Sequence, residues 1–341
     1  MEGRRINKKK YCLIILYISL ALALFAAGFL TKHLIFDRTL PKQDFSEKHI
    51  PGSYKYINPL LECDSQAFSL IKEIGEAKHD ISDLIDDRIK KNKVSSVAVY
   101  YRDLNNGPWF GINEEYVFSP ASLIKVPLMM AYYRLAESDP SVLEKEILVE
   151  QNYDYNVQNV TPEKELELGK RYKVEELIER MITYSDNYAY DVLLANIDNA
   201  LVFQVYDDLG IDIREANTNN PNGNIINVRE YSSFFRVLFN SSYLNINYSE
   251  KALDLLTKTV YQQGLTRDLP TDVAVAHKFG ERTFLNLENE NKQLHDCGII
   301  YLANKPYLLC VMTTGDNITE MSDTIAEISK QVYNFVYLSL K

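Results

Sequence analysis

The stretch FSPASLIKVPLMMAYY, residues 118–133, decides the fold class of this chain. It follows a run typical of a β-strand and then stays apolar for several helical turns, which predicts a buried helix. Ser119-Pro120 marks the helix start, and Pro127 falls near the end of the first turn, where a missing N–H costs least. In that turn Ser122 and Lys125 are three residues apart, so a helix places the hydroxyl and the amine on one face.

This spacing suits a nucleophilic serine. A neutral amine at Lys125 can take the proton of Ser122 and make its oxygen an acyl acceptor. A lysine ordinarily has a pKa of about 10.4, so the site must lower it by burial or by a nearby cation. Backbone N–H groups at the helix start would face the developing oxyanion. Ser-Leu-Ile-Lys also occurs at 69–72, inside an expected amphipathic helix, where we interpret the serine as a spectator.

Outward from this stretch, the hydrophobic periodicity predicts an ordered succession of helices and strands. We expect helices at 65–91, 119–138, 172–197 (broken near Ser185), 199–209, 227–239, 249–263 and 322–340, and strands at 94–104, 108–118, 273–280, 294–302 and 306–314. Two strands, a helical block, three strands and a last helix predict an α/β fold of the α+β type. One antiparallel five-stranded sheet is built from both chain ends, and the helical middle forms a second lobe.

The N-terminal region predicts a membrane anchor. Tyr11–Leu30 holds 20 residues without a charge, enough to span a bilayer, and Arg4, Arg5 and Lys8–Lys10 precede it. A basic cytoplasmic tail (1–10), a transmembrane segment (11–30) and an extracellular linker (31–65) would then precede a catalytic domain (66–341). A cleaved signal peptide is the alternative, but its apolar region is usually shorter.

Charge and composition narrow the choice of partners. Beyond residue 33 the chain carries 31 basic and 46 acidic residues, which argues against a nucleic-acid partner. The histidines and the four cysteines show no metal-ligand spacing, so we expect neither a metal nor a cofactor. Cys297 and Cys310 lie in expected neighbouring strands. They could pair, but we interpret them as buried free thiols.

Two further segments bear on the site. Ser185-Asp186-Asn187 interrupts a helical pattern, where these residue types have poor propensity; taken alone, it could be a helix break or cap. Lys278-Phe279-Gly280 lies on an expected strand, where a lysine is commonly a guard against aggregation.

Together, in this order, the three segments resemble the Ser-x-x-Lys, Ser-Asp-Asn and Lys-Thr-Gly set of class A β-lactamases and penicillin-binding proteins. Residues 118–133 look like the family's nucleophile helix, and HDCGIIYLANKPYLLCVMTTG looks like its last two strands. The resemblance covers roughly residues 66–341. It implies a membrane-anchored serine hydrolase, a monomer facing the bacterial cell envelope, that opens β-lactams or acts on cell-wall peptides.

The resemblance also implies a role for each matching residue. Ser122 is acylated, Lys125 takes or relays its proton, and Ser185 passes a proton to the leaving nitrogen. Asn187 holds Lys125 and the substrate amide, while Asp186 is structural. Lys278 raises the local positive potential, Gly280 completes the third motif, and the backbone N–H groups of Ser122 and Glu281 bind the oxyanion.

The sequence departs from the family pattern in two places. Phe279 replaces the usual Thr or Ser, whose hydroxyl helps bind the substrate carboxylate; Arg282 is a possible substitute. The segment with the deacylating glutamate is short, although Glu215 and Asn219 keep the family's spacing. Glu215 is therefore either a deacylation base or a solvated acid in a turn. Without such a base the acyl-enzyme should persist, as in a D-Ala-D-Ala-type peptidase, a transpeptidase or a penicillin-binding sensor. An inactive member of the family is a further alternative.

Overall fold

The computed structural model describes residues 55–62, 72–105, 107–150, 165–213, 223–285, 290–303 and 305–338, together with Tyr17, Ser19, Leu20, Lys48 and His49. The chain divides into two compact units, residues 1–45 and 46–341. Among the described residues, no helix has the length and apolar character needed to cross a membrane. The expected anchor at Tyr11–Leu30 falls outside the described residues apart from Tyr17, Ser19 and Leu20.

The larger unit is built on a five-stranded antiparallel sheet with the strand order β4-β3-β11-β10-β9. The strands are β3 (Ser96–Asp103), β4 (Trp109–Ile112), β9 (Val275–Leu285), β10 (Glu290–Ile300) and β11 (Tyr307–Gly315). Both chain ends contribute, as the strand order in the sequence predicted. Among the described strands, β9 lies at one edge of the sheet and pairs with β10.

The strand expected at 108–118 is shorter than predicted. β4 ends at Ile112, because Asn113 adopts a left-handed conformation (φ 51°) and its amide donates to the Val97 carbonyl. Val117–Phe118 forms a separate strand, β5, that pairs with β8 (Ile226–Asn227). This pairing brings the residues before Ser122 next to a segment more than a hundred positions later in the chain.

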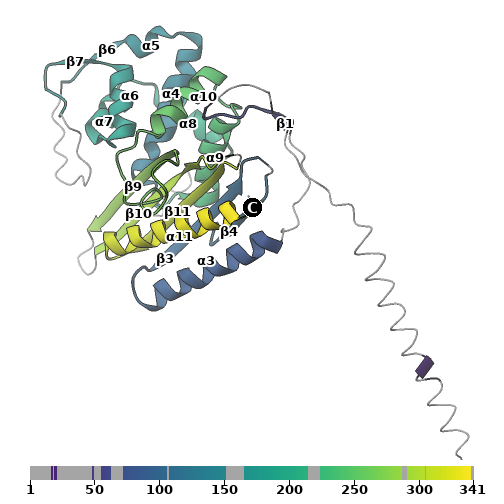
Figure 1. Ribbon diagram of the computed structural model, residues 1–341. Helices are drawn as coiled ribbons and strands as arrows, with labels where there is room; N and C mark the ends of the chain where they lie inside the picture. Colours follow the sequence, from purple (N-terminus) through teal and green to yellow (C-terminus); the bar gives the residue numbers. More distant parts are fainter. Residues whose placement is uncertain are drawn as a thin grey trace, which may run out of the picture. The chain divides into compact units, whose positions relative to one another are not determined.

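Helices cover the two faces of the sheet, and the sheet separates two hydrophobic cores (Figure 1). On one face lie α3 (Lys72–Lys90) and α11 (Ile318–Leu338), which bury Ile81, Ile85 and Ile325. The other face packs against α9 (Val228–Phe239) and the helical lobe. Alternate residues of β3 enter the two cores, with Val97 in one and Ala98 in the other, as the two-residue period of a strand requires.

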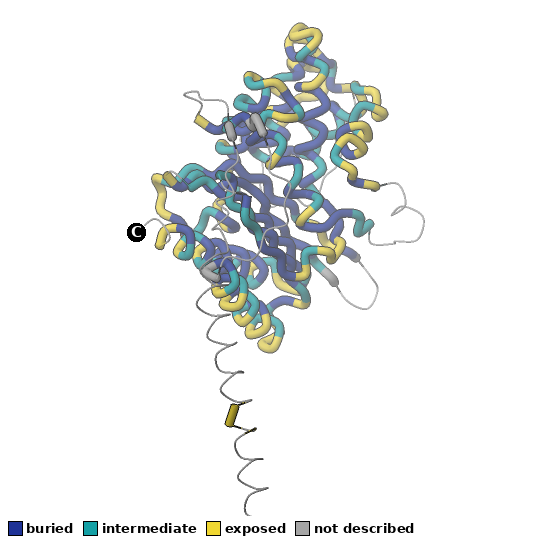
Figure 2. Tube along the Cα trace, turned by 90° about the vertical axis from the view of Figure 1, so that its right-hand side faces the viewer, coloured by how far each residue is buried: buried dark blue, intermediate teal, exposed yellow. Residues whose placement is uncertain are grey.

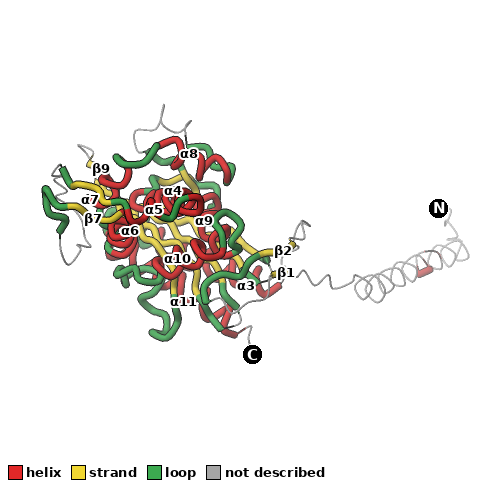
Figure 3. Tube along the Cα trace, turned by 90° about the horizontal axis from the view of Figure 1, so that it is seen from above, coloured by secondary structure: helices red, strands yellow, loops and turns green. Residues whose placement is uncertain are grey.

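The helical lobe is formed by the middle of the chain. Its elements are η2 (Ala121–Ile124), α4 (Lys125–Ser138), α5 (Ser141–Glu144), β6 (Glu146–Leu148), β7 (Arg171–Lys173), α6 (Val174–Thr183), α7 (Asn187–Leu194), α8 (Asn199–Asp208) and α10 (Ile246–Leu256). The strands run buried through the centre of the unit (Figure 2), and helices of the lobe lie over them when seen from above (Figure 3). The expected break near Ser185 is confirmed, because α6 ends before this residue and α7 begins after it.

Part of the expected linker, residues 31–65, packs on this unit. Tyr56 and Ile57 are buried, and the Glu250 carboxylate on α10 accepts hydrogen bonds from both of their backbone N–H groups. Lys48–His49 (β1) also pairs with Leu60–Glu62 (β2). Residues 56–58 therefore pack on the larger unit, with the Asn58 N–H donating to the Phe239 carbonyl, which the lack of periodicity in 31–65 did not indicate.

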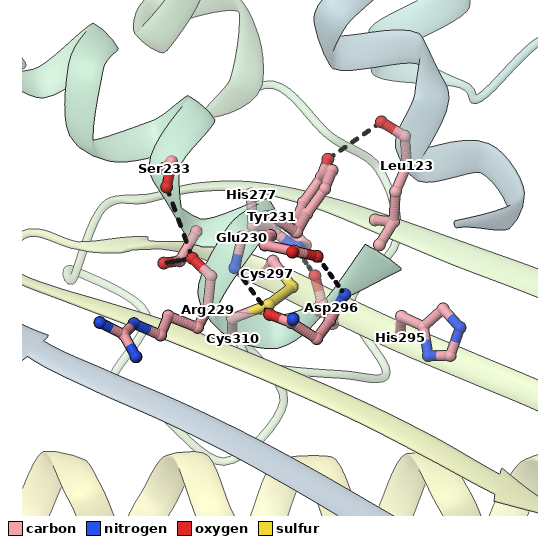
Figure 4. The surroundings of a disulfide bond; sticks show 12 residues. Leu123, Arg229, Glu230, Tyr231, Ser233, His277, His295, Asp296, Cys297 and Cys310 are labelled. Atoms are coloured by element: carbon pink, nitrogen blue, oxygen red, sulfur yellow. Dashed lines mark hydrogen bonds and ion pairs between the residues drawn. A yellow bond between two sulfur atoms is a disulfide. The ribbon is translucent and has the colours of Figure 1, made fainter. Parts of the chain in front are cut away.

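The interpretation of Cys297 and Cys310 as free thiols was wrong. They form a disulfide between β10 and β11, buried beneath α9, close to Tyr231 and Glu230 (Figure 4). The reason is register: the two cysteines are directly opposite each other, so both side chains leave the same face of the sheet. The spacing of the two cysteines along the chain did not reveal this register.

Candidate active site

The nucleophile turn, residues 119–124, connects β5 to α4. The expected helix start differs in detail: the first turn is the 3₁₀ helix η2, and Ala121 within it has a left-handed backbone (φ 46°). Such a conformation costs about 1–2 kcal/mol in a non-glycine residue and persists only where the surroundings hold it. The turn leaves Ser122 partly exposed and carries Lys125 into the interior, where only 1% of its surface is exposed.

Lys125 contacts four oxygens. Its Nζ lies 3.0 Å from Ser122 Oγ, 2.6 Å from the Ser185 carbonyl, 3.0 Å from Ser185 Oγ and 2.6 Å from Asn187 Oδ1. The carbonyl and amide oxygens can only accept, so they take two N–H groups. A neutral amine then has its lone pair left for a hydroxyl. The geometry therefore allows Lys125 to accept the proton of Ser122.

Burial favours that neutral form. Desolvation lowers the pKa of Lys125 to about 7, although the negative charges of Asp186 and Asp191 raise it in part. Near neutral pH a large fraction of the amine is thus unprotonated, as a general base requires.

Lys278 lies on the other side of Ser185. Its Nζ donates to Ser185 Oγ at 2.9 Å and to the Phe279 carbonyl at 2.8 Å, and the residue is fully buried. Burial first, and then the charge of Lys125, lower its pKa well below the ordinary value. A guard against aggregation would be exposed at the strand edge, so that interpretation does not apply here. The Ser185 hydroxyl lies between two amines and can pass a proton from either.

The loop between α6 and α7 explains how Ser185 reaches this position. Asp186 caps α7 by accepting from the N–H groups of Tyr188 and Ala189, and it pairs with Arg180. Ser185 adopts a left-handed backbone (φ 56°), which turns its carbonyl and its hydroxyl toward Lys125. Asp186 is buried and fully used in this cap, in agreement with a structural role.

β9 passes directly beside the nucleophile turn. A Cβ added at Gly280 would lie 3.0 Å from the Pro120 carbonyl and 3.2 Å from the Leu123 nitrogen, so a larger residue would require these neighbours to move by a few tenths of an ångström. Glu281 is the next residue on the same edge strand. The fold thus brings Ser122, Lys125, Ser185, Asn187 and Lys278 into direct or shared contact, with Gly280 and Glu281 beside them.

These residues lie in a part of the chain that matches a known protein family. The model of the β-lactamase enzyme family matches residues 77–336, which is most of the chain. The chain belongs to the β-lactamase enzyme family.

Solved structures have the same fold. A mutant of PBP-A, solved as an acyl-enzyme complex with penicillin G, superposes with a TM-score of 0.65 at 20% identity, covering 77% of this chain and 97% of that chain. A β-lactamase from Chitinophaga pinensis gives 0.64 at 19% identity, covering 76% and 99%. A class A β-lactamase from Mycobacterium abscessus gives 0.62 at 20% identity, covering 76% and 98%. A search of curated proteins gives no match.

Within this β-lactamase-family site, Phe279 provides no hydroxyl. Its ring stacks on Tyr261 with the centroids 4.2 Å apart, and the Nζ of Lys278 lies 4.2 Å from the Phe279 centroid. Only 5% of Phe279 is exposed. Phe279 is therefore a packing residue that supports Lys278, and the hydrogen bond that a Thr or Ser would offer at this position is lost.

Arg282 was a possible substitute for that hydroxyl. Its Nη1 instead donates to Ser119 Oγ at 2.7 Å, and its guanidinium lies over the Phe284 ring. In this β-lactamase-family chain the guanidinium thus contacts the nucleophile turn.

From the sequence, Glu215 was the one carboxylate expected to act at the site. Glu215 and Asn219 lie outside the described residues. Sequence reasoning missed Asp191, which lies one turn beyond Asn187 in α7 and therefore on the same face. Burial raises the pKa of Asp191, whereas Lys125 lowers it. The four-residue spacing from Asn187 was the signal that could have found this carboxylate.

Proposed function

We propose that this protein is a membrane-anchored extracellular serine hydrolase that forms an acyl-enzyme on Ser122 with β-lactams or related cell-wall peptides. The observation that carries the proposal is the 3.0 Å contact between Ser122 Oγ and the buried amine of Lys125. Family membership supports the reaction class, and so does the similar fold of the PBP-A mutant that was solved as an acyl-enzyme complex with penicillin G.

Acylation begins with proton transfer. The neutral amine of Lys125 takes the hydroxyl proton of Ser122 as Oγ attacks the carbonyl carbon of the β-lactam. The oxygen of the tetrahedral intermediate carries the negative charge, and we assign its stabilisation to the backbone N–H groups of Ser122 and Glu281. No metal or cofactor is assigned to this step.

Collapse of the intermediate completes the step. The carbon–nitrogen bond breaks, and the Ser185 hydroxyl protonates the leaving nitrogen while it regains a proton from Lys125 or Lys278. Asn187 orients the amine of Lys125 through its Oδ1. Ser122, Lys125 and Ser185 are thus the proposed catalytic residues, and Asn187, Lys278, Gly280 and Glu281 form the proposed binding surface.

Hydrolysis requires a base for water. The short segment around Glu215 favours slow deacylation, so a D-Ala-D-Ala-type peptidase, a transpeptidase or a penicillin-binding sensor is the second candidate. Both candidates share the acylation of Ser122. They differ in the lifetime of the adduct.

The proposed location is the outer side of a bacterial cell membrane. The charge-free Tyr11–Leu30 segment and the basic residues before it support an uncleaved anchor with the catalytic unit outside. The Cys297–Cys310 disulfide supports an oxidising compartment, since such bonds are rare in the cytosol. We propose a monomer.

One experiment tests the function and separates the candidates. The purified protein is mixed with benzylpenicillin, and intact mass and ring opening are followed together, with Ser122→Ala as the control. An adduct that is absent from the control confirms acylation at Ser122. Rapid product without a lasting adduct indicates a β-lactamase, whereas a lasting adduct with little product indicates the second candidate. No adduct and no product would contradict the proposal.

A further inference from the structure

Ser119 is buried, and all three of its polar groups are hydrogen-bonded. Its N–H donates to Gln293 Oε1 at 2.9 Å, and its Oγ accepts from Arg282 Nη1 at 2.7 Å. Its carbonyl lies 2.9 Å from His295 Nε2. Its exposed fraction is 0%. Three hydrogen bonds therefore hold the backbone and the hydroxyl of Ser119, in addition to its packing.

The tautomer of His295 can be assigned from its partners. The Thr313 N–H donates to Nδ1 at 3.3 Å, so Nδ1 is the acceptor and Nε2–H donates to the Ser119 carbonyl. Complete burial lowers the pKa of His295 to about 4, so the ring is neutral at physiological pH. The neutral ring therefore has a single N–H, and the Ser119 carbonyl accepts it.

The three partners come from β9, which also carries part of the proposed binding surface, and from its neighbour β10. Arg282 lies on β9, two residues beyond Gly280, and Gln293 and His295 lie on β10. Between Ser119 and Ser122 stand only Pro120, which has no N–H, and Ala121 with its left-handed backbone. A strained turn needs external constraints, and these three hydrogen bonds supply them immediately before it.

We propose that Arg282, Gln293 and His295 are positioning residues that hold Ser119 and thereby aim Ser122 at the substrate's carbonyl carbon. Arg282 acts on the nucleophile turn and does not bind the substrate carboxylate. The proposal rests on the proposed acylation of Ser122, because the direction of the hydroxyl matters only for a nucleophile. Through Gln293 Nε2, which donates to Asn224 Oδ1 at 3.1 Å, the same set also contacts the segment that precedes β8.

A double-mutant cycle with two probes tests this assignment. The variants are Ser119→Ala, Arg282→Ala and the combination, made in the full chain. An alkyl fluorophosphonate, which has no carboxylate, labels a reactive serine with loss of fluoride, and benzylpenicillin has the carboxylate. Each single variant should slow labelling by both probes about tenfold, since small misplacements of a nucleophile are costly. The double variant should be no slower than either, because both changes remove one interaction.

The two single substitutions should lower the maximal acylation rate and leave the half-saturating concentration of penicillin unchanged. Arg282→Lys should recover part of the rate that Arg282→Ala loses. Ser329→Ala, which removes a buried hydroxyl that donates to the Leu265 carbonyl on the opposite face of the sheet, is the matched control for stability. It should lower the melting temperature without slowing either probe.

The outcomes test the positioning role separately from the proposed substrate class. If Arg282→Ala weakens penicillin binding but leaves fluorophosphonate labelling unchanged, Arg282 recognises the carboxylate and the positioning role is overturned. Additive effects of the two substitutions would overturn it as well. If the parent protein reacts with the fluorophosphonate but not with penicillin, the proposed substrate class fails while the positioning role is still decided by the fluorophosphonate rates. A parent that reacts with neither probe contradicts both.

Discussion

Lys278 Nζ donates a hydrogen bond of 2.9 Å to Ser185 Oγ, although Lys278 lies on strand β9 of the sheet and Ser185 in the loop between α6 and α7 of the helical lobe. Lys125 Nζ reaches the same hydroxyl at 3.0 Å. One hydroxyl thus connects two buried amines, each with a lowered pKa. This relationship makes the two lobes parts of one acid–base system.

Removing the amine of Lys125 should abolish most acylation. For Lys125→Met we expect the rate of adduct formation with benzylpenicillin to fall about 10²–10⁴-fold, the usual contribution of a general base. The apolar replacement keeps the packing, so the melting temperature should not fall. Lys170→Met, on an exposed turn, is the control. A rate within twofold of the parent in Lys125→Met would show that another group takes the proton.

The acylation rate should depend on pH through the protonation of Lys125. The pKa of this amine is about 7, and only the neutral form accepts a proton from Ser122. The rate should therefore rise about tenfold per pH unit below that value and level off above it. Stopped-flow measurements of penicillin acylation from pH 5 to 9 check this shape. A flat profile across this range would contradict the assignment of Lys125 as the base.

Asp191 should shift that profile. Its negative charge raises the pKa of Lys125, so Asp191→Asn should lower this pKa and move the rising limb to lower pH. The other charge that raises the pKa of Lys125, that of Asp186, is unchanged in this variant. Asp83→Asn on the exposed face of α3 is the control and should leave the limb in place. A limb that moves to higher pH would contradict the predicted sign.

Gly280 should tolerate no side chain. In Gly280→Ala the new Cβ meets the Pro120 carbonyl at 3.0 Å and the Leu123 nitrogen at 3.2 Å, so β9 and the nucleophile turn must separate. We expect acylation to fall about tenfold or more, because the oxyanion donors of Ser122 and Glu281 come from the two sides of this contact. Gly75→Ala on α3, where no atom lies within 4 Å of the new Cβ, is the control. Equal rates in both variants would show that the contact is not needed.

The disulfide should contribute to stability. Replacing Cys297 and Cys310 together by alanine should lower the free energy of unfolding by about 2–4 kcal/mol, since the bond closes a short loop in the unfolded chain. Urea unfolding with and without reductant measures this. Reductant present during unfolding should lower the stability of the parent and leave that of the double variant unchanged. Full labelling of Cys297 and Cys310 in the non-reduced, denatured protein would show that the bond is absent.

Local features were predictable from the sequence because they depend on neighbours in the chain. The three-residue spacing of Ser122 and Lys125 places both on one helical face whatever surrounds them. The interruption at Ser185-Asp186-Asn187 was visible because polar residues that bond their own backbone disfavour a helix interior. The order of strands and helices predicted a five-stranded antiparallel sheet made from both chain ends, and the strand pairings bear this out.

Features that depend on strand register and on contacts between distant segments were decided only by the tertiary structure. Cys297 and Cys310 pair because β10 and β11 align them, and a shift by one residue would turn one of them to the other face. The contacts of two further residues also come from other parts of the chain. Phe279 stacks on Tyr261, and Arg282 donates to Ser119. The sequence by itself thus determined which residues are proposed for acyl transfer. The tertiary structure decided the protonation of Lys125, because burial removes this amine from water and lowers its pKa.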